Sequence, residues 1–333
     1  MTIREVAKAS GVSIATVSRV LNGSDKVSNE VKLAVEQAIA DLNYQKPAPK
    51  RKKATKLFAV IVRNMTNPFF AQLVDVLEQE AYKHGRSILL FNSRNNLQLE
   101  KTFLLECENH KVDGVFLIPR SLKEAHLEPL KSFSFPVILL TATTPLMASI
   151  GTHHQHGGAL AAEHFIQQGH RQIGFIGASG QQSSRFIGFQ NTLNSKGRDL
   201  EERHILTPFT PEQLDVFIKE QIIESSRPIS AIFCSDDIVA SQTFNALKAH
   251  HTPQAEQVEI VGFDDTFIAQ SLGFSSVSQP MKQIALLGFD MMIETIHQGQ
   301  VINKEVLLEP KLIIRHSPAS NRANRKAEIL KEE

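Results

Sequence analysis

Side chains with the chemistry of DNA contact gather in one stretch near the amino terminus, residues 13–22. Val17, Val20 and Leu21 recur there at the spacing of one helix face, and that face requires a partner to bury it. The other side chains then lie on the opposite face of the same helix, free to enter a DNA major groove. They are Ile14, Ala15, Thr16, Ser18, Arg19 and Asn22. The stretch therefore predicts a helix that reads DNA.

Two more helices are needed to bury the apolar face of that stretch. The first is expected to begin at Thr2, because Thr2 and Glu5 have the spacing of a capping box, and Gly11 marks the turn that follows. The third is expected over about residues 28–42, where apolar residues recur at helical spacing. Three short helices of this kind predict an all-α helix-turn-helix domain over residues 1–45.

Basic charge is concentrated at the same end of the chain. Residues 1–56 hold 11 Lys and Arg against 5 Asp and Glu, a net of +6, whereas the 333-residue chain totals +1, so the remainder carries −5. A basic head beside a slightly acidic body is typical of phosphate contact with counterion release. Charges that only solvate a small helical bundle are the alternative, but the turn and the helix spacing favour DNA.

Three motifs of this head are shared with a known family. They are Val6-Ala7, Ser10-Gly11-Val12-Ser13 and Ala15-Thr16-Val17-Ser18-Arg19-Val20-Leu21-Asn22. They closely resemble the DNA-binding head of the lac repressor and galactose repressor family. The resemblance implies that Ile14 and Ala15 read bases and that Arg19 contacts a guanine, which agrees with the two acceptors that guanine offers a guanidinium. The predicted DNA contacts of the head are Thr2, Ser13, Ile14, Ala15, Thr16, Ser18, Arg19 and Asn22. For Ile14 the alternative is core packing, against which its phase in the helix argues.

Residues 46–56 predict a basic linker, because two prolines and six basic residues fall within them. Relatives usually have a short hinge helix here, with a Leu that wedges into the minor groove. This chain has no Leu between Leu42 and Leu57. We therefore expect the segment to grip phosphates, with contacts from Tyr44, Lys50, Arg51 and Lys52. A tether without DNA contact is the alternative.

Downstream of this linker, short apolar runs alternate with helical patterns, which predicts parallel sheets buried on both faces. The expected strands are residues 57–62, 87–91, 114–118, 136–140, 173–176, 231–234 and 258–263. The expected helices are residues 69–84, 99–110, 157–168, 187–196, 211–225 and 238–250. About a dozen elements are too many for one small core, so we expect two doubly wound lobes.

Several motifs of this region resemble the regulatory core of the same family. They include Asn67-Pro68-Phe69-Phe70, Val112-Asp113-Gly114-Val115, Ser235-Asp236-Asp237, Val261-Gly262-Phe263-Asp264-Asp265 and Gln279-Pro280. That core is similar to periplasmic sugar-binding proteins, in which the chain crosses three times between two lobes that close on a small ligand. The resemblance implies a core over residues 57–318, with lobe one at about 57–154 and 281–303, lobe two at about 155–280 and 304–318, and a polar tail at 319–333.

The resemblance implies an effector site in the cleft, where ligands of open α/β sheets bind beyond the carboxyl ends of the strands. Phe69 or Phe70 offers a flat face to a sugar or a base, and Asp264 accepts hydrogen bonds from hydroxyl groups. The candidate effector residues are Arg63, Asn67, Phe69, Phe70, Arg120, Thr141, Arg185, Phe209, Asp236, Asp264 and Gln279. Asp237 is expected to face either the effector or a helix N-terminus, and Asp265 to cap the next helix.

Three arginines suggest the charge of the effector. Arg63 and Arg120 each follow an expected strand, and with Arg185 they would place three cations around one pocket, at a high desolvation cost without an anion. Where sugar-binding relatives often have Asp-Arg, this chain has Thr141-Ala142. An anionic effector such as a sugar phosphate or a small carboxylate is therefore one hypothesis. The other is that Arg63 and Arg120 face solvent or pair with Glu residues.

The tract His153-His154-Gln155-His156 raises the possibility of a metal site. No nearby Cys or carboxylate completes a ligand set, and relatives have Asp-Asn at the first two positions, so we expect a segment that crosses between lobes and no metal. Cys107 and Cys234 lack CxxC spacing and are expected to be reduced packing residues. No cofactor is expected.

These features predict a DNA-binding transcriptional regulator, most simply a repressor of carbohydrate-utilisation genes. The sequence has no dinucleotide fingerprint, no GxxxxGK[ST] and no GxSxG motif, so no enzyme is expected. It has no run of signal-peptide or membrane-span length, which predicts a cytoplasmic protein without membrane insertion. We expect a homodimer on a near-palindromic operator, because the tail lacks leucine heptads. A solute-binding protein without a gene-regulatory role is the alternative.

Overall fold

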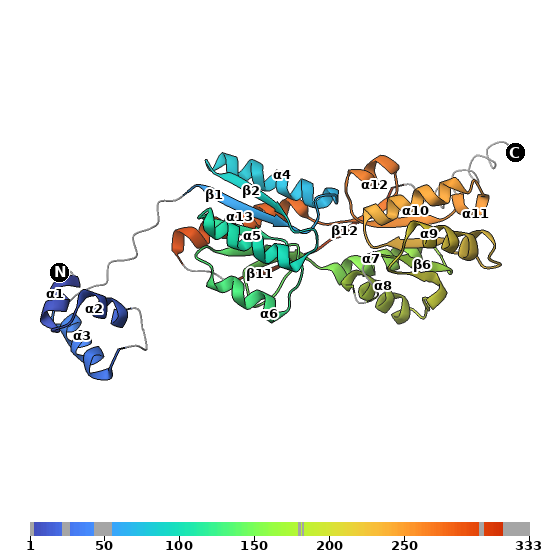
Figure 1. Cartoon of the computed structure of the whole chain (residues 1–333). Coiled ribbons are helices and arrows are strands. Elements are labelled where there is room, and N and C mark those ends of the chain that lie inside the picture. The colour runs from blue at the N-terminus through green and yellow to red at the C-terminus, as the bar shows by residue number, and fades with distance from the viewer. Residues whose placement is uncertain are drawn as a thin grey trace. The chain divides into compact units, whose positions relative to one another are not determined.

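The computed structural model describes residues 3–21, 27–42, 55–178, 181, 183–299 and 303–315. The chain divides into two units, Met1–Ala54 and Thr55–Glu333. The first unit contains helices α1 (Ile3–Ala9), α2 (Ile14–Leu21) and α3 (Asn29–Asp41) (Figure 1). The second contains two six-stranded sheets covered by helices. The expected combination of a helical head and an α/β core with two doubly wound sheets is confirmed.

The head is held together by one small apolar cluster. Val6 of α1, Val17 of α2 and Val35 of α3 are fully buried and form its centre. Gly11 lies in the turn between α1 and α2 with a φ of +66°, a left-handed conformation that glycine adopts without steric cost. Burial of Val17 against the other two helices therefore determines which residues of α2 remain exposed. The capping role expected of Thr2 lies outside the described residues.

Lobe one is built on a wholly parallel sheet in the order β11-β5-β4-β3-β1-β2. Its strands are β1 (Leu57–Val62), β2 (Ser87–Asn92), β3 (Gly114–Leu117), β4 (Val137–Leu140), β5 (Ser149–Thr152) and β11 (Glu305–Leu308). Its helices are α4 (Pro68–Lys83), α5 (Leu97–Asn109), α6 (Glu124–Leu127) and α13 (Met281–Gln298). Burial on both faces explains the unbroken apolar sequence of β1, because Phe58 and Ile61 belong to different apolar clusters.

Lobe two is built on a sheet in the order β12-β10-β9-β8-β6-β7, in which only β12 is antiparallel. Its strands are β6 (Ile173–Ile176), β7 (Ile205–Leu206), β8 (Ala231–Cys234), β9 (Glu259–Asp264), β10 (Ser275–Ser278) and β12 (Lys311–Ile313). Its helices are α7 (His154–Gln167), α8 (Ser184–Ser195), α9 (Pro211–Ile218), α10 (Asp237–Ala249), α11 (Pro253–Glu256) and α12 (Phe267–Leu272).

The chain passes between the two sheets three times, after β5, after β10 and after β11 (Figure 1). One boundary differs from the expected one. Residues 304–318 were assigned to lobe two, but β11 pairs with β5 in the first sheet. Val306 and Leu308 pack against the apolar cluster of lobe one, and this packing holds the strand there. The third crossing therefore lies at Glu309 and Pro310, and only β12 joins lobe two.

Candidate functional site

The exposed face of α2 carries residues that the helical spacing of the sequence predicted for it. Ile14 is 44% exposed, Ala15 and Arg19 are exposed as well, and Val17 between them is fully buried. Thr16 and Ser18 are half-buried. An apolar side chain and an exposed guanidinium on one helix face form a surface suited to base edges.

Ser13 fixes the start of this helix. Its hydroxyl accepts a hydrogen bond from the Thr16 backbone N–H at 3.1 Å and lies 2.9 Å from the Thr16 hydroxyl. This is the N-cap geometry that satisfies a free N–H at a helix terminus. Ser13 and Thr16 therefore position the helix with the same hydroxyls that we expected to contact DNA. The other predicted contacts, Thr2, Asn22, Tyr44, Lys50, Arg51 and Lys52, lie outside the described residues.

A second candidate site lies between the two lobes of the core. It is a cavity of about 430 Å³, a size that suits a small-molecule ligand. Ten of the eleven predicted effector residues line it. Lobe one contributes Arg63, Asn67, Phe69, Phe70, Arg120 and Thr141, and lobe two contributes Arg185, Asp236, Asp264 and Gln279.

Phe209 is the exception, and the prediction that it lines the effector site was wrong. The side chain is half-buried against the apolar cluster of lobe two that contains Leu214, and it does not line the cavity. It lies just before Thr210, which caps the N-terminus of α9. The ring therefore packs against the apolar cluster to which α9 contributes Leu214.

The wall contributed by lobe two is centred on Asp264 at the end of β9. Its carboxylate accepts a hydrogen bond from the Gln279 amide at 2.6 Å and lies 3.3 Å from the Arg185 guanidinium. Arg185 also donates to the Ser235 carbonyl at 2.5 Å and stacks on the Phe263 ring, with 3.8 Å from Cζ to the ring centroid. Burial raises the pKa of Asp264 to about 6, although the charge of Arg185 opposes that shift.

The backbone at two cavity residues is in a conformation that costs energy. Asp264 has a φ of +107° and Thr141 has a φ of +68°, and neither is a glycine. Non-glycine residues with positive φ are held there only when the surroundings enforce it, and they cluster at ligand sites. One contact links the two walls, since the Asn67 amide of lobe one donates to Asp264 at 3.4 Å.

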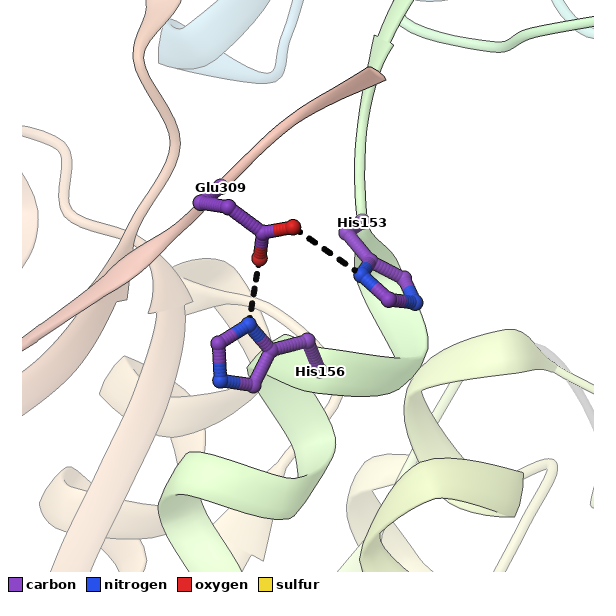
Figure 2. A group of neighbouring side chains, drawn as sticks. All are labelled: His153, His156 and Glu309. Atoms are coloured by element: carbon purple, nitrogen blue, oxygen red, sulfur yellow. Dashed lines mark hydrogen bonds and ion pairs between the residues drawn. The ribbon is translucent and has the colours of Figure 1, made fainter.

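The histidine tract divides between two places. His154 lines the cavity, with Nε2 3.2 Å from the Gln279 amide oxygen, and burial followed by the charge of Arg185 lowers its pKa to about 3. It is therefore a neutral imidazole at pH 7, and it was not among the site residues predicted from the sequence. His153 and His156 instead contact Glu309 (Figure 2), and none of these three residues lines the cavity. The expectation that no carboxylate lies near the tract was wrong, because the third crossing supplies one.

The wall contributed by lobe one contains two arginines that form no ion pair within the described ranges. Arg63 directly follows β1 and lies over the Phe70 ring, 5.5 Å from its centroid. Burial, and then the charges of Arg185 and Arg120, lower the pKa of Arg63, and its Nε is buried with no hydrogen-bond partner. Arg120 is exposed, and its Nε donates to the Asn95 carbonyl at 3.3 Å. Within the described ranges, neither guanidinium forms an ion pair with a carboxylate.

The adjacent aspartates at the strand ends have separate roles. Asp236 lines the cavity while its carboxylate caps α10 by accepting from Val239 N–H at 3.0 Å. Asp237 turns away and accepts hydrogen bonds from Thr266 and Ser276, and burial raises its pKa to about 7.

Asp265 was expected to cap a helix, but it pairs with Arg315 at 2.6 Å instead. Thr266 occupies the N-cap position of the following helix, α12.

The cysteines show no reactive character. Cys107 and Cys234 are free and buried, and burial raises the pKa of Cys107 to about 12, so it is a protonated thiol at pH 7. Burial raises the pKa of Cys234 as well.

Among the helices that the structure describes, none has both the length and the apolar character needed to span a membrane.

Two family models match this chain. Residues 2–46 match "Bacterial regulatory proteins, lacI family", and residues 162–318 match "Periplasmic binding protein-like domain". Similar proteins include the HTH-type transcriptional repressor PurR of Edwardsiella ictaluri (strain 93-146), 28% identical over 331 residues, covering 96% of this chain and 97% of that protein. The repressor of the same name from Yersinia enterocolitica is 29% identical over 333 residues, covering 96% and 97%.

Solved structures of similar fold include ligand and operator complexes. A transcriptional regulator CelR–cellobiose complex has a TM-score of 0.67 at 24% identity, covering 95% of this chain and 99% of that one. The lac repressor dimer bound to operator and the anti-inducer ONPF has a TM-score of 0.67 at 22% identity, covering 96% and 99%. A periplasmic binding protein/LacI regulator from Alkaliphilus metalliredigens with D-xylulofuranose has a TM-score of 0.66 at 25% identity, covering 79% and 99%.

Proposed function

The chain belongs to the lacI family of bacterial regulatory proteins, and from that premise we propose that it is a transcriptional repressor controlled by a small molecule bound between its lobes. It is not an enzyme. Its partners are operator DNA, an effector and a second copy of the chain. Its place of action is the cytoplasm, where operator DNA is found. A solute binder without a regulatory role is disfavoured by the lacI-type head.

One observation carries the DNA-binding part of the proposal. Helix α2 buries Val17 and exposes Ile14, Ala15 and Arg19, so one apolar pair and one guanidinium can reach base edges together. A single helix of this kind reads few bases, and useful affinity needs two heads on successive major grooves of a near-palindromic operator. Dimerisation is therefore part of the mechanism.

Effector binding is proposed to act by closing the lobes. Closure would change the distance between the two heads of a dimer, and such coupling is typically worth about 1–3 kcal/mol. The regulated genes are proposed to serve carbohydrate use, since similar proteins were solved with cellobiose and with D-xylulofuranose. Asp264 and Gln279 supply polar groups for sugar hydroxyls, and Phe70 supplies an apolar face.

The charges of the cavity favour an anionic effector. Arg185 is already paired with Asp264, whereas Arg63 is half-buried, with a buried Nε, and forms no ion pair with a carboxylate in the described chain. An anionic group placed near Arg63 and the neighbouring Arg120 would balance this charge. A sugar phosphate combines that group with hydroxyls for the Asp264 wall, and a small hydroxy-carboxylate has the same two features.

The DNA-binding part can be tested with labelled DNA from the region upstream of the chain's own gene. In a gel-shift or anisotropy titration, Arg19→Ala is expected to weaken specific binding by about ten- to a hundredfold, because a bidentate contact to guanine is worth about 1–3 kcal/mol. Binding to DNA of unrelated sequence should change much less. Equal affinity of Arg19→Ala and wild type for the specific site would refute the proposed reading face.

The effector part can be tested separately by calorimetry with sugars and the matching sugar phosphates. The phosphates are expected to bind more tightly and to shift the operator titration. Tight binding of the neutral sugars without binding of their phosphates would contradict an anionic effector. Native mass spectrometry of the purified protein, which reports a co-purified small molecule by mass, provides an independent identification.

A further inference from the structure

Two of the three crossings between the lobes meet at a cluster of two histidines and one glutamate. His153 follows β5 on the first crossing, His156 lies in the first turn of α7, and Glu309 lies between β11 and β12 on the third crossing (Figure 2). The backbone N–H of His153 also donates to the Leu308 carbonyl at 2.9 Å. Side chains from the two separate crossings are thus held side by side.

The ligand atoms of this cluster converge. Nδ1 of His153 lies 3.3 Å from one Glu309 oxygen, and Nδ1 of His156 bonds to the other. All three ligand atoms lie within 4.8 Å of one another. The side chains are 41%, 42% and 59% exposed, so an ion can reach them from solvent. From this arrangement we infer a binding site for a divalent first-row transition metal ion.

The donor set fits such an ion. Two imidazole nitrogens and one carboxylate oxygen are ligands that Zn²⁺ takes at about 2.0–2.2 Å, and two tetrahedral ligands at that distance lie roughly 3.3 Å apart. The separation of the His153 nitrogen and the Glu309 oxygen matches that edge. Imidazole suits Zn²⁺, Ni²⁺ and Cu²⁺ better than Mg²⁺ or Ca²⁺. Exposure of all three side chains leaves a fourth position for water.

An ion bound at this cluster would link two of the crossings between the lobes. Bound metal joins the first crossing to the third, so it restricts the relative movement of the segments on which the lobes hinge. His154, between the two metal-binding histidines in the sequence, lines the effector cavity. An ion at the cluster is thus expected to affect lobe closure, and this consequence, unlike metal binding itself, rests on the proposed function.

Metal binding is tested with the full-length protein, freed of any histidine tag and of metal. Titration with Zn²⁺ in a non-coordinating buffer should show one ion per chain, and Co²⁺ should give the visible absorption of a low-coordinate site. His156→Ala is expected to weaken Zn²⁺ binding more than tenfold and to abolish the Co²⁺ band. Glu309→Gln, which preserves shape but removes the anionic ligand, should weaken it as well. His110→Ala removes an exposed histidine of α5's C-terminus and serves as the matched control.

Two results would overturn the site. One is a wild-type protein that binds no Zn²⁺ in the micromolar range, in which case the cluster is only a hydrogen-bonded link between crossings. The other is unchanged Zn²⁺ affinity and stoichiometry in both variants. Unfolding temperatures without metal, compared with wild type, show whether each variant is folded.

The effect on the hinge has its own measurement. Hydrogen exchange of the wild-type protein should slow around residues 152–157 and 305–313 when Zn²⁺ is added, and His156→Ala should show no such change. Operator binding is recorded in the same samples. Failure of operator binding with intact Zn²⁺ binding would refute the proposed function alone, whereas the reverse result would refute the metal site alone.

Discussion

The two walls of the effector cavity hold charged groups in different states. On the lobe-two wall, Arg185 is paired with Asp264, and Gln279 bridges Asp264 and His154. On the lobe-one wall, Arg63 is half-buried, with a buried Nε, and forms no ion pair with a carboxylate in the described part of the chain. A paired wall is ordered before any ligand arrives. The charges of Asp264 and Glu100 favour the charged form of Arg63 but do not offset its burial, so a ligand that brings negative charge would stabilise it further. Lobe two is thus organised to orient a ligand, and lobe one to attract it.

The same substitution on each wall tests this difference, and Arg185→Met is expected to have the larger effect. Removing one partner of a buried ion pair leaves Asp264 uncompensated, which typically costs about 3–5 kcal/mol of unfolding free energy. Loss of Arg185 raises the pKa of Asp264 further above its usual value. A carboxyl group with a raised pKa in the folded state makes the fold less stable as the pH rises through that pKa. The unfolding free energy lost by Arg185→Met should therefore be greater at pH 8 than at pH 5. Urea unfolding at both pH values measures it.

His154→Asn examines the neutral member of the lobe-two wall. Burial lowers the pKa of His154 to about 3, so between that value and the ordinary imidazole pKa the unfolded chain binds the extra proton. Wild-type stability therefore falls as the pH drops below about 6.5. Asn cannot take up this proton, so the variant should gain about 2.5 kcal/mol of unfolding free energy relative to wild type as the pH falls from 7 to 4.5. Parallel stability curves of the two proteins would show that His154 titrates normally.

Arg63→Met is the matched change on the lobe-one wall, and a smaller effect on stability is expected. No ion pair is lost, and an apolar side chain over Phe70 relieves the burial of a charge. The unfolding free energy should change by less than about 1 kcal/mol, whereas affinity for a sugar phosphate should fall by about tenfold or more, the size of a charge-assisted hydrogen bond. If Arg63→Met destabilises the protein as much as Arg185→Met, the two walls do not differ as described.

Sequence patterns predicted the most apolar strands of both sheets and missed others, including β10, which lies between β12 and β9 in the second sheet. The runs at 57–62, 173–176 and 231–234 became β1, β6 and β8 with the expected bounds, because burial on both faces leaves a continuous apolar signal. Strand β10 was missed because its sequence is rich in serine. Ser275 and Ser276 are nevertheless fully buried, since they hydrogen-bond to Arg315 N–H and the Asp237 carboxylate. Such long-range partners are invisible to local periodicity.

The same limit explains the errors at the sites. Residues at the ends of parallel strands could be placed in the cleft from topology alone. His154 could not, because its partner Gln279 is 125 positions away, and Glu309 lies 156 positions from His153. Phe209 was placed by resemblance alone, and packing decided otherwise.

The smallest expected effect concerns the aromatic rings, where the two lobes again differ. Phe70 of lobe one lines the cavity next to Arg63, whereas Phe209 of lobe two is half-buried against an apolar cluster and does not line the cavity. Phe209→Leu should therefore leave sugar-phosphate affinity within about twofold of wild type while lowering stability by less than about 1.5 kcal/mol, as for other apolar exchanges of similar volume. Phe70→Leu should lower the affinity severalfold, because a flat ring face is lost. Calorimetry on both variants separates the two rings, and a larger loss of affinity in Phe209→Leu would mean that this ring enters the cavity when the ligand binds.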